Sequence, residues 1–255
     1  LALHGWLDNA GSFARLAPLL AAHWRVIALD LPGHGHSQHL GAGARYHFVD
    51  YVEAVLAAVE ALPLQRYTLL GHSLGAGIAS LVAAATPERI ERLLLIEGLG
   101  PIADDGSHTL QRFRQGLEPG PASARPLRVF AEIELAVRAR TQASGLRGEL
   151  AQFIVERGLA PTEDGWRWRS DPRLTRTTPI RLAESQVRAL LAGIAAPTDL
   201  LLARPQTPYL PEAWLRERAA CVPGLRIEYL DGGHHLHLEH PEAVAAWIER
   251  CRARR

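Results

Sequence analysis

Short apolar runs alternate with longer amphipathic stretches along much of the chain. Each run ends at a glycine, a proline or a charged residue, which is typical of buried strands followed by turns. Strands that alternate with helices in this way favour a parallel sheet with helices on both faces. The expected strands are residues 1–3, 25–29, 67–70, 93–96, 198–203 and 225–230.

The stretches between these runs carry a helical period. Between residues 48 and 62, apolar side chains recur at the spacing of one helix face, so this segment is expected to pack on the sheet. Further helices are expected to begin at Leu74, Pro211 and Pro241.

Residues 101–195 have a different character. Arg-rich amphipathic segments at 127–140 and 146–157 are joined by loops rich in proline and glycine, and no parallel-strand pattern is evident. We therefore expect a helical cap inserted into a core of residues 1–100 and 196–255. The predicted fold class is α/β, with a doubly wound, mostly parallel sheet.

The balance of charges argues against partners that bind through a strong electric field. The 255 residues include 28 basic and 27 acidic side chains, for a formal charge of +1, and every basic residue is an arginine. We therefore expect a small-molecule partner and neither nucleic acid nor a membrane. The absence of lysine excludes Schiff-base chemistry.

Cysteine usage predicts a cytoplasmic location. Cys221 and Cys251 lie far apart and lack the spacing of a metal site, which favours a reducing compartment, with a disulfide between them as the alternative. No apolar run reaches the length of a transmembrane helix. The chain begins at a strand-like segment without methionine, so a preceding signal peptide stays open.

The stretch Gly71-His72-Ser73-Leu74-Gly75 follows an expected strand and begins an expected helix. This is the context of a nucleophile elbow, in which a sharp turn strains the backbone of the serine and leaves no room for side chains at the flanking glycines. The helix N-terminus also supplies free N–H groups that suit an oxyanion. An ordinary glycine-rich turn is the alternative, and the flanking strand and helix favour the elbow.

A second oxyanion donor is expected from the tripeptide His4-Gly5-Trp6, at the end of the first strand. The backbone N–H of Trp6 would be one donor and that of Leu74 the other. Taken alone, a plain turn explains this tripeptide equally well.

A metal site is one interpretation of the histidines that follow Asp30. His34, His36 and His39 have the spacing of a binuclear zinc hydrolase, but Gln38 stands where an acidic residue should precede the last histidine. The remaining ligands have no obvious candidates. A turn with solvated histidines is preferred, and no metal is expected.

In order and spacing, four motifs resemble the α/β-hydrolase fold superfamily: His4-Gly5-Trp6, Asp30-Leu31-Pro32-Gly33-His34-Gly35-His36-Ser37, Gly71-His72-Ser73-Leu74-Gly75, and Gly233-His234 with Glu239-x-Pro241. The chain is similar to the cap-bearing branch, which holds epoxide hydrolases, haloalkane dehalogenases, lactone and ester hydrolases and serine hydrolase-like proteins. The resemblance covers essentially the whole chain and is least specific in the cap. It implies that two N-terminal strands are missing here.

The resemblance also implies which histidine acts in the run from Gly232 to Pro241. The catalytic histidine of the family follows the last strand, after a glycine and before a helix that opens at Glu-x-Pro, which implies His234 as the general base. His235, His237 and His240 do not hold that position. They are expected to be exposed or packed on the loop, and a metal site among them would lack a carboxylate framework.

The acid of the triad departs from the family pattern. The usual aspartate position, after the strand 198–203, is Gln206, whose neutral amide cannot offset an imidazolium charge. We prefer Glu97 to the absence of an acid, because active sites of open α/β sheets gather at the carboxyl ends of strands. Some dehalogenases of the family carry their acid there. Asp199 lies at the wrong end of its strand.

A serine at the elbow argues against the dehalogenase and epoxide-hydrolase chemistries, which in this family use an aspartate nucleophile. The sequence therefore predicts a serine hydrolase of carboxylic esters that needs no cofactor and forms an acyl-enzyme on Ser73. Alternatives are a lactonase, a thioesterase, a cofactor-free haloperoxidase, a carbon–carbon bond hydrolase, and a ligand-binding protein without turnover. The cap would cover the pocket and determine which substrate shapes fit it.

Overall fold

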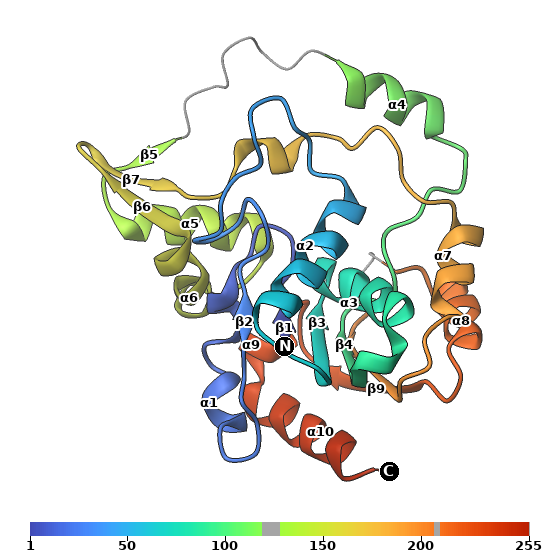
Figure 1. Cartoon of the computed structure of the whole chain (residues 1–255). Coiled ribbons are helices and arrows are strands. Elements are labelled where there is room, and N and C mark those ends of the chain that lie inside the picture. The colour runs from blue at the N-terminus through green and yellow to red at the C-terminus, as the bar shows by residue number, and fades with distance from the viewer. Residues whose placement is uncertain (119–127, 207–209, 255) are drawn as a thin grey trace.

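Within residues 1–118, 128–206 and 210–254, which the computed structural model describes, a parallel sheet of six strands forms the centre (Figure 1). All six expected strands are present, although the expected strand at 25–29 is reduced to its last two residues. The strands follow the order β2-β1-β3-β4-β8-β9 across the sheet. Their bounds are β1 (Ala2–Leu3), β2 (Ala28–Leu29), β3 (Tyr67–His72), β4 (Ile90–Ile96), β8 (Thr198–Arg204) and β9 (Arg226–Asp231).

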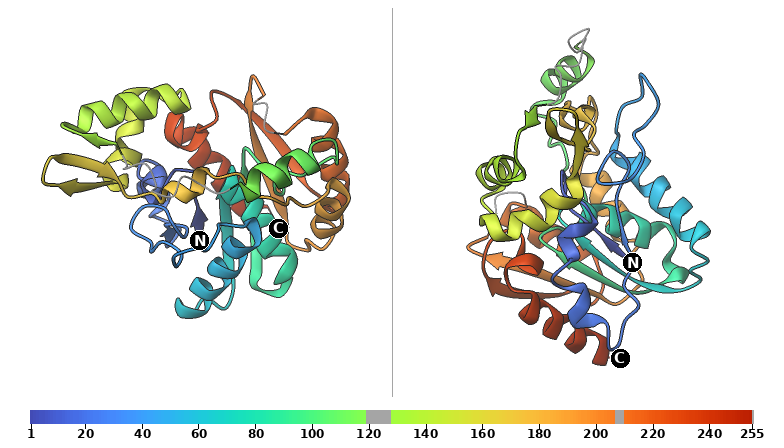
Figure 2. Two further views of the ribbon diagram at one scale, coloured as in Figure 1. Left: turned by 90° about the horizontal axis from the view of Figure 1, so that it is seen from above. Right: turned by 90° about the vertical axis from the view of Figure 1, so that its left-hand side faces the viewer.

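Helices cover both faces of this sheet (Figure 2), because successive side chains of a strand point to opposite faces. In β4, Leu93 and Leu95 pack in the same apolar cluster as α2, α3, α7 and α8. Leu94 and Ile96 pack on the other face, with α1 and α10. The bounds of these helices are α1 (Ala17–Leu20), α2 (Phe48–Ala61), α3 (Leu74–Ala85), α7 (Glu184–Leu191), α8 (Glu212–Cys221) and α10 (Pro241–Ala253).

The segment between β4 and β8 differs in part from the sequence prediction. It carries helices, as expected, but it also carries a three-stranded antiparallel sheet in the order β5-β7-β6, which the sequence pattern did not predict. These strands are two to four residues long, too short to show an alternating pattern. The bounds are α4 (Thr109–Leu117), β5 (Val129–Phe130), α5 (Ile133–Ser144), α6 (Gly148–Gly158), β6 (Leu159–Thr162) and β7 (Gly165–Trp168).

The β4–β8 segment packs against loops of the main sheet. Leu150 and Ile154 of α6 share an apolar cluster with Leu238 of the short helix α9 (Leu236–Glu239), which follows β9. The side-chain amide of Asn9, in the loop after β1, donates a hydrogen bond to the carbonyl oxygen of Ile154 at 2.7 Å. The segment therefore contacts the loops that follow β1 and β9.

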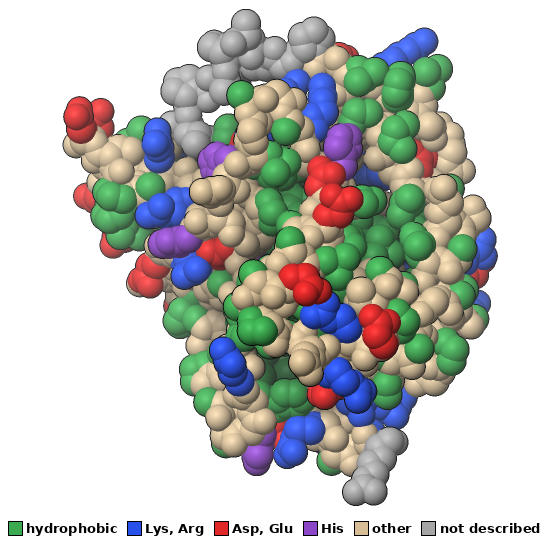
Figure 3. All heavy atoms as spheres, viewed as in Figure 1, with side chains coloured by type: hydrophobic (Ala, Val, Ile, Leu, Met, Phe, Trp, Pro, Cys, Tyr) green, Lys and Arg blue, Asp and Glu red, His purple; other side chains and the backbone are tan. Residues whose placement is uncertain are grey.

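The structure shows how charged side chains and the two cysteines are placed. Acidic and basic side chains are interspersed over the face seen in Figure 3. Cys221 and Cys251 are free, so the alternative of a disulfide between them is wrong. Of the helices in the described ranges, none combines the length and the apolar character needed to cross a membrane.

Candidate active site

The carboxyl end of β3 carries the predicted nucleophile. Ser73 lies between β3 and α3 with φ of 53° and ψ of −114°, a strained conformation of the kind that the elbow motif predicts. A Cβ atom at Gly71 would lie 2.4 Å from the carbonyl oxygen of Gly75, and one at Gly75 would lie 2.2 Å from that of Leu3. Only glycine fits at these two positions, and β1, β3 and α3 therefore converge at Ser73.

The two predicted oxyanion donors flank this junction. Leu74 is the first residue of α3, and Trp6 lies in the turn after β1, against which Gly75 packs. Among the hydrogen bonds of the described residues, none uses the backbone N–H of either Trp6 or Leu74. The indole of Trp6 donates instead to the carbonyl oxygen of Leu174, in the β4–β8 segment, at 3.2 Å.

His4 serves the turn and not the chemistry. It is buried, and its Nδ1 lies 2.8 Å from the carbonyl oxygen of Gly5, while its Nε2 accepts a hydrogen bond from the amide of Leu31 at 3.0 Å. Burial lowers the pKa of His4. The ring therefore stays neutral and ties the loop after β1 to the loop after β2.

The three histidines with zinc-hydrolase spacing face different surroundings. His34 is buried, and its Nδ1 lies 3.0 Å from the carbonyl oxygen of Pro32. His36 and His39 are exposed, and Nε2 of His39 contacts the carbonyl oxygen of Arg169 at 2.7 Å. In the described part of the chain, none of the three belongs to a group of potential metal ligands.

Glu97 and His234 meet at the carboxyl end of the sheet. Nδ1 of His234 lies 3.1 Å from Oε2 of Glu97, and Oε1 of the same carboxylate accepts a hydrogen bond from the amide of Ala203 at 2.5 Å. The carboxylate is buried, whereas 18% of the His234 side chain is exposed. A carboxylate at Nδ1 selects the tautomer with a proton on that nitrogen, which leaves Nε2 as a base.

The loop of His234 also meets the serine elbow. Nε2 of His72, the residue before Ser73, donates to the carbonyl oxygen of His234 at 2.8 Å, and the two imidazole rings lie 4.8 Å apart. Glu239 holds the loop from the other side, because its carboxylate accepts a hydrogen bond from the amide of Gly233 at 2.7 Å. The structure thus brings together the segments that carry Ser73, Glu97 and His234.

The other polar residues considered as the acid of the triad make contacts elsewhere. The side-chain amide of Gln206 donates to the carbonyl oxygen of Leu210 at 3.0 Å, within its own loop. Asp199 lies at the opposite end of β8, where it accepts hydrogen bonds from Arg92 at 3.0 Å and from Arg226 at 2.7 Å. Asp199 therefore forms structural ion pairs, at the end of the strand where the sequence analysis placed it.

A second group of side chains, which the sequence analysis missed, lies behind His234. The carboxylate oxygen Oδ2 of Asp8 lies 3.6 Å from Nδ1 of His72 and 3.3 Å from Nε2 of His235, and all three side chains are buried. The other oxygen, Oδ1, binds Arg140 of α5. The expectation that a metal site among His235, His237 and His240 would lack a carboxylate is therefore wrong at His235. The signal was present, because Asp8 follows β1 at the same edge of the sheet.

Burial and charge set the protonation of this group. Burial lowers the pKa of His72 to about 4 and holds the pKa of His237 well below its usual value. Burial also disfavours the charged form of Asp8, but His235 and Arg140 outweigh it and hold the pKa of Asp8 well below its usual range. At neutral pH, Asp8 is therefore ionised while His72 and His237 are neutral.

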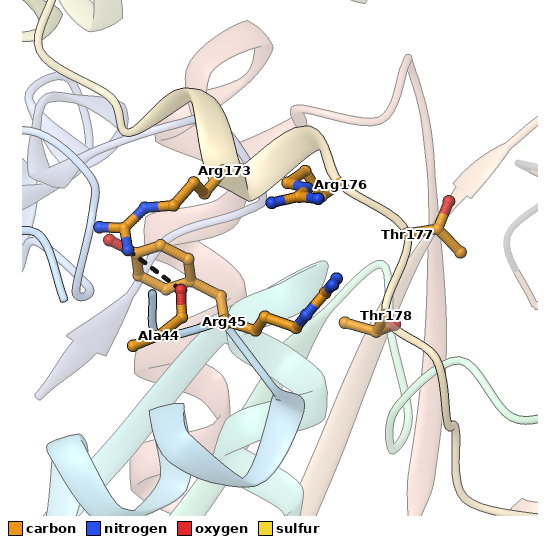
Figure 4. Close-up of a pocket in the computed structure, with 7 residues that line it drawn as sticks. Ala44, Arg45, Arg173, Arg176, Thr177 and Thr178 are labelled. Carbon is orange, nitrogen blue, oxygen red and sulfur yellow. Dashed lines mark hydrogen bonds between the residues drawn. The ribbon is translucent and has the colours of Figure 1, made fainter. Parts of the chain in front are cut away.

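A small pocket lies apart from these residues, between the turn before α2 and the short helix at Pro172–Thr175 (Figure 4). Arg173 of this pocket already forms an ion pair with Asp171. None of the residues named above as candidates for catalysis lines it. Its lining consists of Ala44, Arg45, Tyr46, Arg173, Arg176, Thr177 and Thr178.

Comparison with known proteins gives relatives over nearly the whole length. The family model of the alpha/beta hydrolase fold matches residues 1–241. A serine hydrolase-like protein of Danio rerio is 31% identical over 264 residues, which cover 97% of this chain and 79% of the relative.

Two solved structures extend this comparison. A hypothetical protein from Pseudomonas aeruginosa PAO1 has a TM-score of 0.91 and 41% identity, covering 99% of this chain and 90% of that one. A thioesterase domain from the curacin biosynthetic pathway has a TM-score of 0.82 and 27% identity, covering 97% and 89%. The chain therefore belongs to the alpha/beta hydrolase fold family, and we conclude that it is a hydrolase.

Proposed function

We propose that the protein hydrolyses carboxylic esters or related acyl compounds through an acyl-enzyme on Ser73. The observation that carries this proposal is the contact of 3.1 Å between His234 Nδ1 and the buried carboxylate of Glu97, in a loop that touches the serine elbow. A nucleophile, a base and a buried acid in this order form the arrangement that acyl transfer requires.

The proposed reaction has two matching halves. Nε2 of His234 takes the proton from the hydroxyl of Ser73, whose oxygen attacks the carbonyl carbon of the substrate. The N–H groups of Trp6 and Leu74 hold the oxyanion, and Glu97 offsets the imidazolium charge on His234. The imidazolium then protonates the leaving alcohol, and water repeats the sequence on the acyl-enzyme. No step uses a metal or an organic cofactor.

The proposed partner is a small molecule with an ester-like carbonyl. We propose residues 101–195 as the cap over the site, because α6 packs on α9, directly after His234. A thioester is the second candidate substrate, since the thioesterase domain of the curacin pathway is similar to this chain over 97% of its length. The cytoplasmic location stays a prediction of the sequence.

An active-site probe tests the nucleophile. A fluorophosphonate should label the wild-type protein and fail to label Ser73→Ala, and ester turnover should fall by about 10⁴-fold or more in that variant. A folded wild-type protein that takes no label would contradict the proposal. Esters and thioesters with the same acyl chain, compared by kcat/KM, then decide between the two substrate classes.

A further inference from the structure

Three potential metal ligands converge behind His234. Oδ2 of Asp8, Nδ1 of His72 and Nε2 of His235 all lie within 4.8 Å of one another. The three residues come from the loop after β1, the end of β3 and the loop after β9. Within the described ranges of the chain, Asp8, His72 and His235 are the group of three or more histidine, cysteine or acidic residues whose ligand atoms lie close enough to bind one ion.

The hydrogen bond of His72 fixes where its lone pair points. A carbonyl oxygen only accepts, so the contact of 2.8 Å between Nε2 of His72 and the carbonyl oxygen of His234 places the ring proton on Nε2. Nδ1 of the neutral ring is therefore a bare acceptor.

This bare acceptor faces another acceptor. Nδ1 of His72 lies 3.6 Å from the carboxylate oxygen Oδ2 of Asp8, and neither atom has a hydrogen-bond partner among the residues that the structure describes. Two buried acceptors that face each other without a proton between them cost free energy, and Nε2 of His235, 3.3 Å from Oδ2, is a further neighbour of that oxygen. A cation between them satisfies both, and it also takes the nearby Nε2 of His235 as a third ligand.

We propose that Asp8, His72 and His235 form a binding site for a divalent transition-metal ion of the Zn²⁺ class. Ligand atoms of one tetrahedral Zn²⁺ lie about 3.3 Å apart, given bonds of about 2.0–2.1 Å. Oδ2 of Asp8 lies 3.6 Å and 3.3 Å from the two ring nitrogens, close to that spacing. The two nitrogens lie within 4.8 Å of each other, so they need to approach by at most about 1.5 Å. One coordination position is left for water.

The outer contacts of the three ligands match those of protein metal sites. A ligating histidine usually donates its other ring N–H to a carbonyl oxygen, as His72 does to His234. Ligating carboxylates are usually hydrogen-bonded through their second oxygen, as Asp8 is to Arg140. The guanidinium lies on Oδ1 and leaves Oδ2 to face the site.

Cobalt provides a probe of the site that does not depend on activity. Co²⁺ added to metal-free wild-type protein should give the visible absorption of a tetrahedral complex with nitrogen and oxygen ligands, and equimolar Zn²⁺ should displace it. Ser73→Ala should give the same spectrum, because the hydroxyl is not a ligand. Zn²⁺ should also raise the Tm of both proteins, as a ligand of the native state does.

A pair of variants in one loop separates this site from the other histidines. His235→Ala should lose the tetrahedral spectrum and bind Zn²⁺ about 100-fold or more weakly, since outer partners alone are worth about 10–100-fold. His240→Ala, an exposed histidine of the same loop, should bind as wild type does. Asp8→Asn repeats the test with a ligand from a different loop.

The wild-type titration alone can overturn the proposal. If metal-free wild-type protein shows no tetrahedral Co²⁺ absorption and no rise of Tm with Zn²⁺, the three residues do not bind an ion. Equal binding by wild type and a folded His235→Ala would also overturn it. A failure of the fluorophosphonate label would concern the proposed function alone.

Discussion

Two regions of this molecule use histidine in opposite ways. After β4 and β9, His234 contacts the carboxylate of Glu97, and 18% of its side chain is exposed. In the loops after β1 and β2, His4 and His34 are buried. Within the described residues, the hydrogen bonds of their rings all join backbone atoms. A carboxylate stabilises an imidazolium and access to solvent admits a substrate, whereas burial keeps an imidazole neutral. The first arrangement suits proton transfer and the second suits a turn.

Among the variants that compare these two regions, Glu97→Gln is expected to have the largest effect. The amide keeps the size of the side chain but cannot offset the charge on His234, so kcat for an ester should fall by about 10³–10⁴-fold. Steady-state kinetics on the folded variant measure this loss. Unchanged turnover would show that Glu97 is not the acid and would remove the contrast between the two regions.

The Asp8→Asn variant tests whether a buried carboxylate beside histidines is necessarily catalytic. The variant leaves the guanidinium of Arg140, which is 11% exposed, without its countercharge. We expect the free energy of unfolding to fall by about 3–5 kcal/mol. Urea unfolding measures the loss, and kcat should stay well above that of Glu97→Gln. A loss of turnover equal to that of Glu97→Gln at unchanged stability would contradict this assignment.

The buried histidines should make stability depend on pH. Burial lowers the pKa of His34 to about 3. Below about pH 6.5, the unfolded chain therefore binds a proton at His34 that the native state does not bind. Stability is therefore present in full above this range and falls as the pH drops from 6.5 toward 3, by up to about 3 kcal/mol at pH 4.

His34→Asn keeps a donor for the carbonyl oxygen of Pro32 and removes the titrating ring. Urea unfolding at several pH values should show a shallower loss of stability in this variant than in wild type. His36→Ala, two residues away and exposed, is the matched control and should follow wild type. If His34→Asn shows the wild-type slope, His34 is not kept neutral by its surroundings.

The smallest effect is expected from Gln206→Ala. Its amide contacts the carbonyl oxygen of Leu210, so its loss should remove one hydrogen bond, worth about 1 kcal/mol, and leave kcat near the wild-type value. The variant is the matched control for Glu97→Gln. A large fall of kcat here would move the third member of the triad to Gln206.

The sheet and the elbow could be predicted because their signals are local. Each of the six main strands stands as an apolar run, and the two glycines of the elbow lie two residues before and two residues after Ser73. The short strands β6 and β7 were missed, although the turn that joins them carries Asp164-Gly165, a recognised hairpin signal. This turn lies beyond the amphipathic segments expected at 127–140 and 146–157, and no strand was expected there.

The group behind His234 could not be predicted with the same ease. Asp8, His72 and His235 come from three segments that are far apart in sequence, so no spacing links them. The strand order makes neighbours of β1, which Asp8 follows, and β3, which ends at His72, whereas His235 comes from the loop after β9, an edge strand of the sheet. The edge rule that favoured Glu97 applies equally to Asp8, but burial and the tautomer of His72 require coordinates.

Arg140 makes the inserted segment and the core mutually dependent. Its guanidinium reaches from α5 to the carboxylate of Asp8 and to the carbonyl oxygen of Leu7. A chimera that takes this segment from a relative without an arginine at that place would bury an anion with no countercharge beside the proposed oxyanion turn. An experiment that replaces this segment to change the substrate preference therefore has to keep Arg140 or substitute Asp8 at the same time.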